Sequence, residues 1–435
     1  MNYKKFFDKA KDYDLDSLEL HINKTTKLSF SLFKNEIDSY SIADSYQIAA
    51  KGIYKGTMGY ANSEKLDKTT PDFICSKIRE NAMVITSDDK RFIYEGSPKY
   101  KKGNVYSKKL AEAETNSKIA LAKELDRKVK ELDPRITEVE TQYEEVVEEL
   151  TLLNSYGLKL SQKSNYAYIF SSAVANDEAG NTKNGYAIKL FNDLDEVNVD
   201  ELAKEVVRKT ISQFGSAPCK SGKYKCIFDS KTFSSFLSFF LDNLSSEEVQ
   251  KGTSLLKDKL NQQVTSTKLT ITEEPLKKNV FFRYFDDEGV ATYNKTLIKK
   301  GILQTYTYNL KTAAKDNVAS TGNGYRGISL NNVCVKGGKI TEAQLIEKVG
   351  NGVYINNVQG LHSGMNPQSG NFSLQAQGFM IRDGKLAEPL SLITVAGNLF
   401  DIFMNIKELA SNNELQTNSY DVPSVFIKAI QVSGK

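Results

Sequence analysis

At 435 residues the chain exceeds what one hydrophobic core usually supports, so we expect two domains. Its 58 basic and 54 acidic residues nearly balance and mostly alternate in sign, which argues against a nucleic-acid-binding surface. No apolar run is long enough to cross a bilayer, and the polar N-terminus does not look like a secretory signal. We therefore expect a cytoplasmic protein that does not enter a membrane.

The first part of the chain alternates between helical and strand-like patterns. Met1–Asp12 is typical of a short amphipathic helix, and Ser17–Ile22 and Lys27–Phe33 alternate apolar and polar residues as half-buried strands do. Gln47–Tyr60 continues that alternation, with glycines at strand ends or bulges. Asp67–Thr86 returns to helical spacing.

The next part is richer in helix formers. Ser107–Leu132 carries opposite charges four residues apart and predicts one long helix or two in tandem. Ile136–Ser172 alternates again, which predicts a meander of three or four strands, and Asn176–Gly185 is typical of a polar turn. A helix over Val199–Phe214 ends at Gly215, where we place the domain boundary.

These patterns predict an α+β fold of two domains, residues 1–214 and residues 215–435. The N-terminal domain should hold helices and an antiparallel sheet, and the C-terminal domain should be mainly β. The elements expected in the second half are a strand at Lys223–Phe228, a helix at Thr232–Leu241 capped by Asp229, strands near Leu269–Thr272 and Val280–Phe285, and helices at Thr341–Val349 and Leu399–Glu408.

Several motifs in the second half occur together and in a fixed order. They are FDDEGV at 285–290, LIKKGIL at 297–303, STGNGYRG at 320–327, GLHSGMNPQSGNFSLQAQGF at 360–379 and ITVAGNLFDIF at 393–403. With them the chain resembles the TldD/PmbA family, and within it the TldE/PmbA branch. The resemblance implies the TldD/PmbA type of C-terminal domain.

The resemblance also implies where a metal would lie. In the TldD branch an HExxxH zinc motif lies on the helix after the first strand of the C-terminal domain, which corresponds here to Ser235–Asp242. This chain has only two histidines, His21 and His362, and it lacks the family's C-terminal cysteine because no cysteine follows Cys334. The resemblance therefore implies no metal ligands and no cofactor in this chain, and zinc in a TldD-like partner.

The function that the resemblance implies is that of the non-metal-binding TldE/PmbA-like subunit of a two-component metallopeptidase. Such a complex would cleave unfolded or extended peptides, and this chain would supply chamber wall and partner interface in place of catalytic side chains. In isolation the chain could form a homodimer. Whether it is an enzyme by itself is left open.

The acidic run Asp286–Glu288 and the histidine His21 are both expected to have structural roles. Asp286, Asp287 and Glu288 could form a carboxylate cluster for a metal, but neighbouring residues on an extended chain point to opposite faces, so we expect a turn or capping role. His21 lies in an alternating strand and is expected to be a cross-strand polar residue.

The candidate peptide-binding or interface residues lie in glycine-containing loops. Arg326 follows Thr321–Gly324, where a structural turn competes with a loop that approaches a peptide carboxylate. Asn366, Asn371 and Asn398 suit turns, and their amides could also bind peptide backbone.

His362, in a loop between Gly360 and Gly364, is a further peptide-binding or interface candidate, because an imidazole can donate to a peptide carbonyl. It is also the only candidate for a catalytic residue, because an imidazole can act as a base near neutral pH. No serine or cysteine stands in the sequence context of an activated nucleophile. An autonomous, metal-independent hydrolase that uses His362 is therefore the alternative function.

The family is also associated with modulation of DNA gyrase, which would make the chain a regulatory binding protein. No helix-turn-helix or RNA-recognition signature supports direct contact with DNA. The four cysteines, Cys75, Cys219, Cys226 and Cys334, form no CxxC pair and are expected to be reduced and buried.

Overall fold

The computed structural model describes residues 3–85 and 92–435. The fold is α+β, as predicted, and the chain divides into two compact units. Unit 1 comprises Met1–Ile211 and Lys278–Thr292, and unit 2 comprises Ser212–Lys277 and Tyr293–Lys435. The expected boundary after Phe214 lies close to the first crossing between the units. The return of Lys278–Thr292 to unit 1 was not expected.

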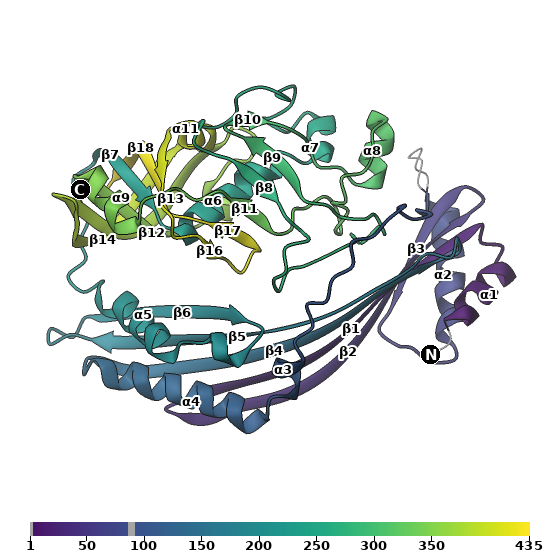
Figure 1. Cartoon of the computed structure of the whole chain (residues 1–435), viewed down its shortest axis with the longest axis horizontal. Coiled ribbons are helices and arrows are strands. Elements are labelled where there is room, and N and C mark those ends of the chain that lie inside the picture. Colours follow the sequence, from purple (N-terminus) through teal and green to yellow (C-terminus); the bar gives the residue numbers. More distant parts are fainter. Residues whose placement is uncertain (1–2, 86–91) are drawn as a thin grey trace. The chain divides into compact units, whose positions relative to one another are not determined.

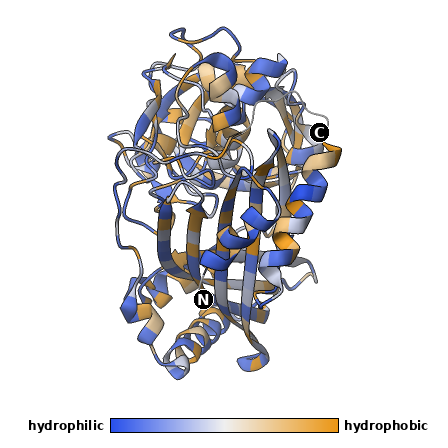
Figure 2. Ribbon diagram, turned by 90° about the vertical axis from the view of Figure 1, so that its right-hand side faces the viewer, coloured by the Kyte–Doolittle hydropathy of each residue, from blue (hydrophilic) through white to orange (hydrophobic). Residues whose placement is uncertain are grey.

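Unit 1 is built on one antiparallel sheet of six strands in the order β3-β2-β1-β4-β5-β6 (Figure 1). Its long strands carry alternating hydrophilic and hydrophobic bands (Figure 2), as expected when the two faces of a sheet have different surroundings. The strands are β1 Ser17–Phe33, β2 Glu36–Tyr54, β3 Thr57–Ser63, β4 Ile136–Asn154, β5 Lys159–Asn176 and β6 Thr182–Phe191.

Two strand predictions in unit 1 were wrong in their boundaries. The expected strands Ser17–Ile22 and Lys27–Phe33 form the single strand β1, because β2 and β4 pair with it continuously through the polar residues between them. The region 136–172 holds two long strands in place of three or four.

The third strand of that meander, β6, begins inside the expected polar turn Asn176–Gly185. The turn itself is short, because Asp177 accepts hydrogen bonds from the backbone and the side-chain amide of Asn181, each at 2.8 Å. Gly185 lies within β6 and allows close packing, since a Cβ there would come within 2.5 Å of the Thr210 backbone nitrogen.

The helices of unit 1 pack against the sheet. The expected long helix is two helices in tandem, α3 and α4, and α4 and α5 lie together on one face (Figure 1). Buried polar contacts fix α4, since Lys118 lies 2.6 Å from Glu145 of β4. The helices are α1 Lys4–Asp12, α2 Thr70–Val84, α3 Lys108–Glu112, α4 Thr115–Leu132 and α5 Val199–Ile211, with a short 3₁₀ turn at Leu194–Glu196. The predicted end of the second helix, Thr86, lies outside the described residues.

The returning segment Lys278–Thr292 is irregular, so the predicted strand at Val280–Phe285 was wrong. Hydrogen bonds that use one side chain each, from β5 or from the segment, join it to β5 in place of a strand ladder. Gln162 donates to the Phe282 carbonyl at 2.7 Å, and the Tyr284 hydroxyl donates to the Ser161 carbonyl at 2.7 Å. A segment whose backbone bonds to side chains has no need of a neighbouring strand.

The acidic residues of this segment have structural roles. The buried Asp286 carboxylate accepts hydrogen bonds from the backbone nitrogens of Glu288 and Val290 at 3.0 and 2.9 Å, which is the predicted turn role. Asp287 lies 2.7 Å from the Arg283 guanidinium and 3.6 Å from Nε2 of His21. His21 thus faces a carboxylate as well as its cross-strand neighbours Ala49 and Leu152.

Unit 2 contains a closed barrel. Strands β14, β13, β12, β7 and β18 pair in that order, and β14 also pairs with β18 and closes the ring. β15 adds to the outside of β18. The strands are β7 Gly222–Phe228, β12 Gly352–Gln359, β13 Asn371–Arg382, β14 Lys385–Asn398, β15 Ile406–Leu409 and β18 Val425–Ser433.

A second sheet of short strands lies in the same unit, in the order β10-β9-β8-β11-β17-β16. One hydrophobic core contains residues of both sheets and of α6. The strands are β8 Ile271–Glu273, β9 Lys295–Lys299, β10 Ile302–Leu303, β11 Val333–Val335, β16 Glu414–Leu415 and β17 Tyr420–Val422. The helices are α6 Ser230–Asp242, α7 Ser246–Lys251, α8 Leu310–Asp316, α9 Glu342–Val349, α10 Leu361–Gly364 and α11 Leu399–Met404.

The helix predicted at Thr341–Val349 is confirmed as α9, with Thr341 as its cap. The helix predicted at Leu399–Glu408 was too long, because α11 ends at Met404 and Ile406–Leu409 forms the strand β15, which pairs with β18.

The four cysteines are free, as predicted, but only three are buried and Cys334 is partly exposed. Within the described ranges, every helix is too short or too polar to span a membrane.

Asp287 predicts a dependence of stability on pH. Burial alone would raise the pKa of its carboxyl, but His21 and the charge of Arg283 outweigh burial and lower the pKa to about 2. A carboxyl whose pKa is lower in the folded state stabilises the fold above its unfolded pKa, and this contribution is lost as the pH falls from about 4 to about 2. We expect Asp287→Asn to lower the free energy of unfolding by about 2 kcal/mol at pH 7.

Urea unfolding of both proteins between pH 7 and pH 2 checks this expectation, and the difference between them should shrink below pH 4. Asp383→Asn is the matched control, because Asp383 is exposed in a turn and its replacement should leave the stability nearly unchanged. A difference between wild type and Asp287→Asn that stays constant with pH would contradict the role of this charge.

Candidate functional site

The helix α6 is the structural centre of the candidate site. Its first turn is fixed by Asp229, whose carboxylate accepts a hydrogen bond from the Thr232 backbone nitrogen at 2.8 Å, as predicted. One face of α6 is fully buried through residues such as Phe233, Phe236 and Phe240. Its C-terminal end differs, because Asp242 is exposed. The helix is therefore core along one face and surface at its end.

Two cavities open at this end of α6. The larger has a volume of about 470 Å³, and the smaller has a volume of about 330 Å³. Asp242 and Glu248 line both cavities, so the two volumes adjoin the same pair of carboxylates. The larger is lined by Ser238, Leu241, Asp242, Ser245, Glu247, Glu248, Thr307, Ile328, Ser329, Leu330, Asn418 and Tyr420, and the smaller by Phe239, Asp242, Asn243, Glu248, Thr253, Pro367 and Gln368.

The charge of these cavities is negative. Asp242, Glu247 and Glu248 line them without a cation among the lining residues, although Lys251 lies 3.0 Å from Glu247 and 3.4 Å from Glu248. Although Asp242 is exposed at the surface, protein atoms around its carboxyl displace part of the water there, and this desolvation and the nearby charge of Glu248 raise the pKa of that carboxyl. Such a site favours ligands with amide donors or a protonated amine.

The loop before β13 forms one wall of the smaller cavity through Pro367 and Gln368. The structure brings Asn366, Asn371 and Asn398 together in this loop. Asn366 accepts hydrogen bonds from the backbone nitrogens of Gln368 and Ser369, both at 3.0 Å. Asn366 is therefore part of the turn that presents Pro367 and Gln368.

Asn398 joins this loop to the start of α11. Its amide donates to the Ser369 carbonyl at 2.8 Å and to the Asn371 side chain at 3.0 Å, and its carbonyl oxygen caps α11 at the Phe400 nitrogen at 3.0 Å. Asn366 thus has the turn role that was one of the two predicted, whereas Asn371 begins β13 and Asn398 ends β14, where the two residues pair with each other. The three asparagines position the cavity wall, and none of them lines either cavity.

His362 lies at the edge of the site. It is exposed on the short helix α10, and its ring centre is 5.9 Å from that of Phe239, which lines the smaller cavity. The thiols offer no nucleophile for an imidazole to activate, since burial raises the pKa of all four cysteines, that of Cys334 to about 12. A cysteine peptidase would need a lowered thiol pKa.

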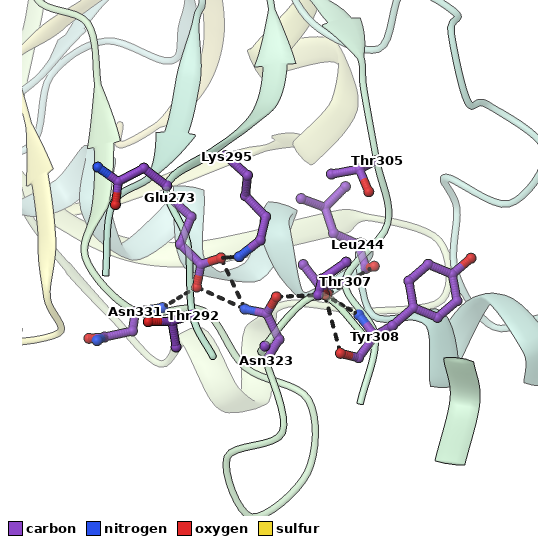
Figure 3. A network of polar contacts seen from close by, with 12 residues as sticks. Leu244, Glu273, Thr292, Lys295, Thr305, Thr307, Tyr308, Asn323 and Asn331 are labelled. Carbon is purple, nitrogen blue, oxygen red and sulfur yellow. Dashed lines mark hydrogen bonds and ion pairs between the residues drawn. The ribbon is translucent and has the colours of Figure 1, made fainter. Parts of the chain in front are cut away.

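The TGNG segment belongs to a buried polar network (Figure 3). Asn323 donates to the two carboxylate oxygens of Glu273 at 2.8 and 3.0 Å, and Lys295 forms an ion pair with the same carboxylate. The backbone nitrogen of Asn331 donates to Glu273 at 2.8 Å. Glu273 therefore joins β8, β9 and the loop from Thr321 to Asn331. Residues 328–330 of this loop line the larger cavity.

The sequence did not reveal this network. The sequence pattern indicates Asn323 only as part of the glycine-containing loop at Thr321–Gly324, and it gives no indication for Glu273 or Lys295. Glu273 lies between Thr272 and Glu274 in a short strand, and Lys295 follows 22 residues later, so no local pattern signals that one is buried against the other. Arg326 is exposed with a positive φ of 45°, and in the described chain no hydrogen bond or ion pair joins it to the three asparagines.

The side chains at this place do not fit a zinc ion. A zinc site needs three or four nitrogen, sulfur or carboxylate ligands that converge. Positions 235–242 of α6 carry serine, phenylalanine, leucine and one aspartate. Between residues 3 and 85 and between 92 and 435, no three His, Cys, Asp or Glu side chains are arranged to hold a metal ion.

Comparison with known proteins gives consistent matches. Residues 221–434 match the family model of the PmbA/TldA metallopeptidase C-terminal domain, and residues 108–214 match that of its central domain. A protein named metalloprotease PmbA homolog from Buchnera aphidicola subsp. Acyrthosiphon pisum is 32% identical over 65% of this chain, a region that spans 62% of that relative.

Two solved structures are similar over almost the whole chain. A Thermotoga maritima protein named a modulator of DNA gyrase is 27% identical, with a TM-score of 0.91 over 99% of this chain and 100% of its own. TldE from Thermococcus kodakarensis is 21% identical, with a TM-score of 0.90 over 99% of each chain, and this second likeness shows the fold.

The network around Glu273 predicts a large effect of one substitution. Replacing Lys295 by Met leaves a buried carboxylate without its cation, and the loss of one partner of a buried ion pair costs about 3–5 kcal/mol. We expect Lys295→Met to lower the free energy of unfolding by that amount, measured in urea. Glu273→Gln combined with Lys295→Met should recover most of the loss, because the double variant has no unpaired charge.

Arg382→Met is the matched control, since Arg382 pairs with Glu388 on the surface, where such a pair contributes under about 1 kcal/mol. Equal effects of Lys295→Met and Arg382→Met would show that Glu273 is not held as described.

Proposed function

This chain belongs to the PmbA/TldD family of metallopeptidase-like proteins, and we propose that it is the subunit that does not bind zinc in a two-component peptidase. The observation that carries the proposal is the composition of α6. The helix at the position of the family's zinc motif offers phenylalanine and serine side chains, most of which pack into the core. A helix buried in this way cannot also direct two imidazoles at a metal.

In the proposed complex a TldD-like relative supplies the zinc and the hydrolytic water, and both subunits act in the cytoplasm. This chain contributes a wall of the peptide chamber and the interface with the relative. The substrate is an unfolded or extended peptide, since a strand-like chain can be held through main-chain groups without any catalytic residue on this subunit.

The two cavities support this role. Their volumes of about 470 and 330 Å³ suit several side chains of an extended peptide, and they adjoin through Asp242 and Glu248. The loop that Asn366 holds lines the smaller cavity through Pro367 and Gln368, and residues 328–330, which follow Arg326 in the chain, line the larger one. Segments that shape the cavities therefore contain the candidate residues Arg326, Asn366, Asn371 and Asn398. Direct contact between these residues and a bound peptide is part of the proposal.

The proposal predicts that activity requires both subunits. We expect an unfolded protein substrate such as casein to be cleaved by a mixture of this chain with a relative that bears HExxxH, and not by this chain alone. A zinc chelator should abolish the activity of the mixture. The control is a mixture in which the glutamate of the relative's HExxxH motif is replaced by glutamine, which should be inactive. Chelator-resistant cleavage by this chain alone would contradict the proposal.

His362→Ala separates the proposal from the autonomous hydrolase. A general base contributes about 10²–10⁴-fold to a rate, so its removal from an active site would reduce cleavage by at least about a hundredfold. We expect the mixture with His362→Ala to cleave within about twofold of the wild-type rate, because His362 is exposed beside Phe239 and lies outside the cavity linings. Ser363→Ala, at the neighbouring position on α10, is the matched control.

A further inference from the structure

The larger cavity at the end of α6 has an apolar wall and an acidic wall. The apolar wall is formed by Leu241, Ile328 and Leu330, and the acidic wall contains Asp242 and Glu248. Lysine and arginine side chains have the same division, because an aliphatic stem carries a cationic head. The cavity volume of about 470 Å³ lies within the range of about 300–1,000 Å³ that is typical of ligand pockets.

The carboxylates of this cavity outnumber the cations beside them. Lys251 lies 3.0 Å from Glu247 and 3.4 Å from Glu248, so one cation serves two carboxylates. In the part of the chain that the structure describes, no ion pair or side-chain hydrogen bond joins Asp242 to another residue. Asp242 therefore lines both cavities with an unpaired carboxylate.

The charged form of Asp242 is disfavoured in the free protein. Desolvation and the charge of Glu248 raise the pKa of the Asp242 carboxyl, and both act against its ionised state. A cation bound beside the two carboxylates would offset their repulsion and form charge-assisted hydrogen bonds. An acidic side chain would add to the repulsion, so the cavity discriminates between peptides by charge.

A cationic side chain fits this cavity better than a metal ion does. Within residues 3–85 and 92–435, no three His, Cys, Asp or Glu side chains are arranged to hold a metal. Glu248 is also bonded already to Lys251 and Thr253. A guanidinium or ammonium group can bind to two carboxylates without a full coordination shell, and its stem gains contact with the apolar wall.

We propose that the larger cavity binds a basic side chain of the peptide substrate, an arginine or a lysine, with its cationic head at Asp242 and Glu248 and its stem on the apolar wall. This assignment rests on the proposed function, because the peptide is the substrate of the two-component peptidase. Asp242 is then a specificity-determining residue on the subunit that does not bind zinc.

Binding of short peptides to the full chain tests this assignment without any cleavage. The probes are acetylated and amidated pentapeptides with two alanines on each side of a central arginine, lysine or citrulline. Citrulline keeps nearly the shape of arginine but has no charge. Dissociation constants are measured by calorimetry for wild type and for Asp242→Asn. Glu347→Gln is the matched control, because it removes an exposed carboxylate of α9 outside both cavity linings.

We expect wild type and Glu347→Gln to bind the arginine and lysine peptides at least about tenfold more tightly than the citrulline peptide, since hydrogen bonds between charged groups are stronger than neutral ones. Asp242→Asn should bind all three peptides within about threefold, with an unchanged circular dichroism spectrum. Wild type that shows no preference for a basic peptide, or Asp242→Asn that keeps the preference, would overturn the assignment.

A terminal ammonium group has a similar chemistry and needs its own probe. The citrulline peptide with a free N-terminus should bind as weakly as its acetylated form. Binding as tight as that of the arginine peptide, lost in Asp242→Asn, would assign the cavity to the terminus and overturn the assignment to a side chain.

Cleavage of casein by the mixture with the HExxxH-bearing relative separates this assignment from the proposed function. An active mixture whose zinc-free subunit shows no preference for basic peptides would overturn the assignment alone. An inactive mixture would contradict the peptidase role, while a preference that depends on Asp242 would still support the binding of a basic side chain.

Discussion

The burial of one face of α6 is the constraint on which the site depends. Phe233, Phe236 and Phe240 lie in a core that contains residues of both sheets of unit 2, and each buried phenylalanine contributes about 1.5–3 kcal/mol relative to exposure. The Asp229 cap adds to this at the first turn. Because the helix cannot rotate without exposing these rings, Asp242 at its end has a defined place beside Glu248.

The same packing bears on whether α6 could present ligands to a metal. A helix can present imidazoles to a zinc ion only if that face borders an open, polar space. Here phenylalanine and leucine occupy much of the helix, and Phe228, Phe372 and Phe403 are ring neighbours of its phenylalanines. The polar cavities lie instead at the C-terminal end of the helix, where Asp242 and Glu248 line both of them.

Loops form part of the walls of those cavities, beside residues of α6, α7 and β17, and polar contacts hold each loop in one conformation. The segment 321–331 is held by the Glu273 carboxylate, and the loop before β13 is held by Asn366 and Asn398. The first arrangement satisfies the partly buried backbone nitrogen of Asn331, and the second holds an exposed turn in one conformation. Two of the five motifs through which the chain resembles its family, those at 320–327 and 360–379, include residues of these two loops.

Local pattern was enough to predict much of the fold. Apolar spacing and a capping residue identified α6 and α9, and alternation identified strands in unit 1, because helix and strand periodicity depend on neighbours in the chain. The motifs in the second half identified the family and the place of the absent zinc ligands. The sequence by itself thus determined the α+β class, the family and the residue types on α6.

Only the tertiary structure decided that β1 is one strand, that Lys278–Thr292 returns to unit 1, and that Glu273 contacts Lys295 and Asn323. Those features depend on contacts between residues far apart in the chain, and no local pattern records which distant residue will supply a strand ladder or a counter-charge.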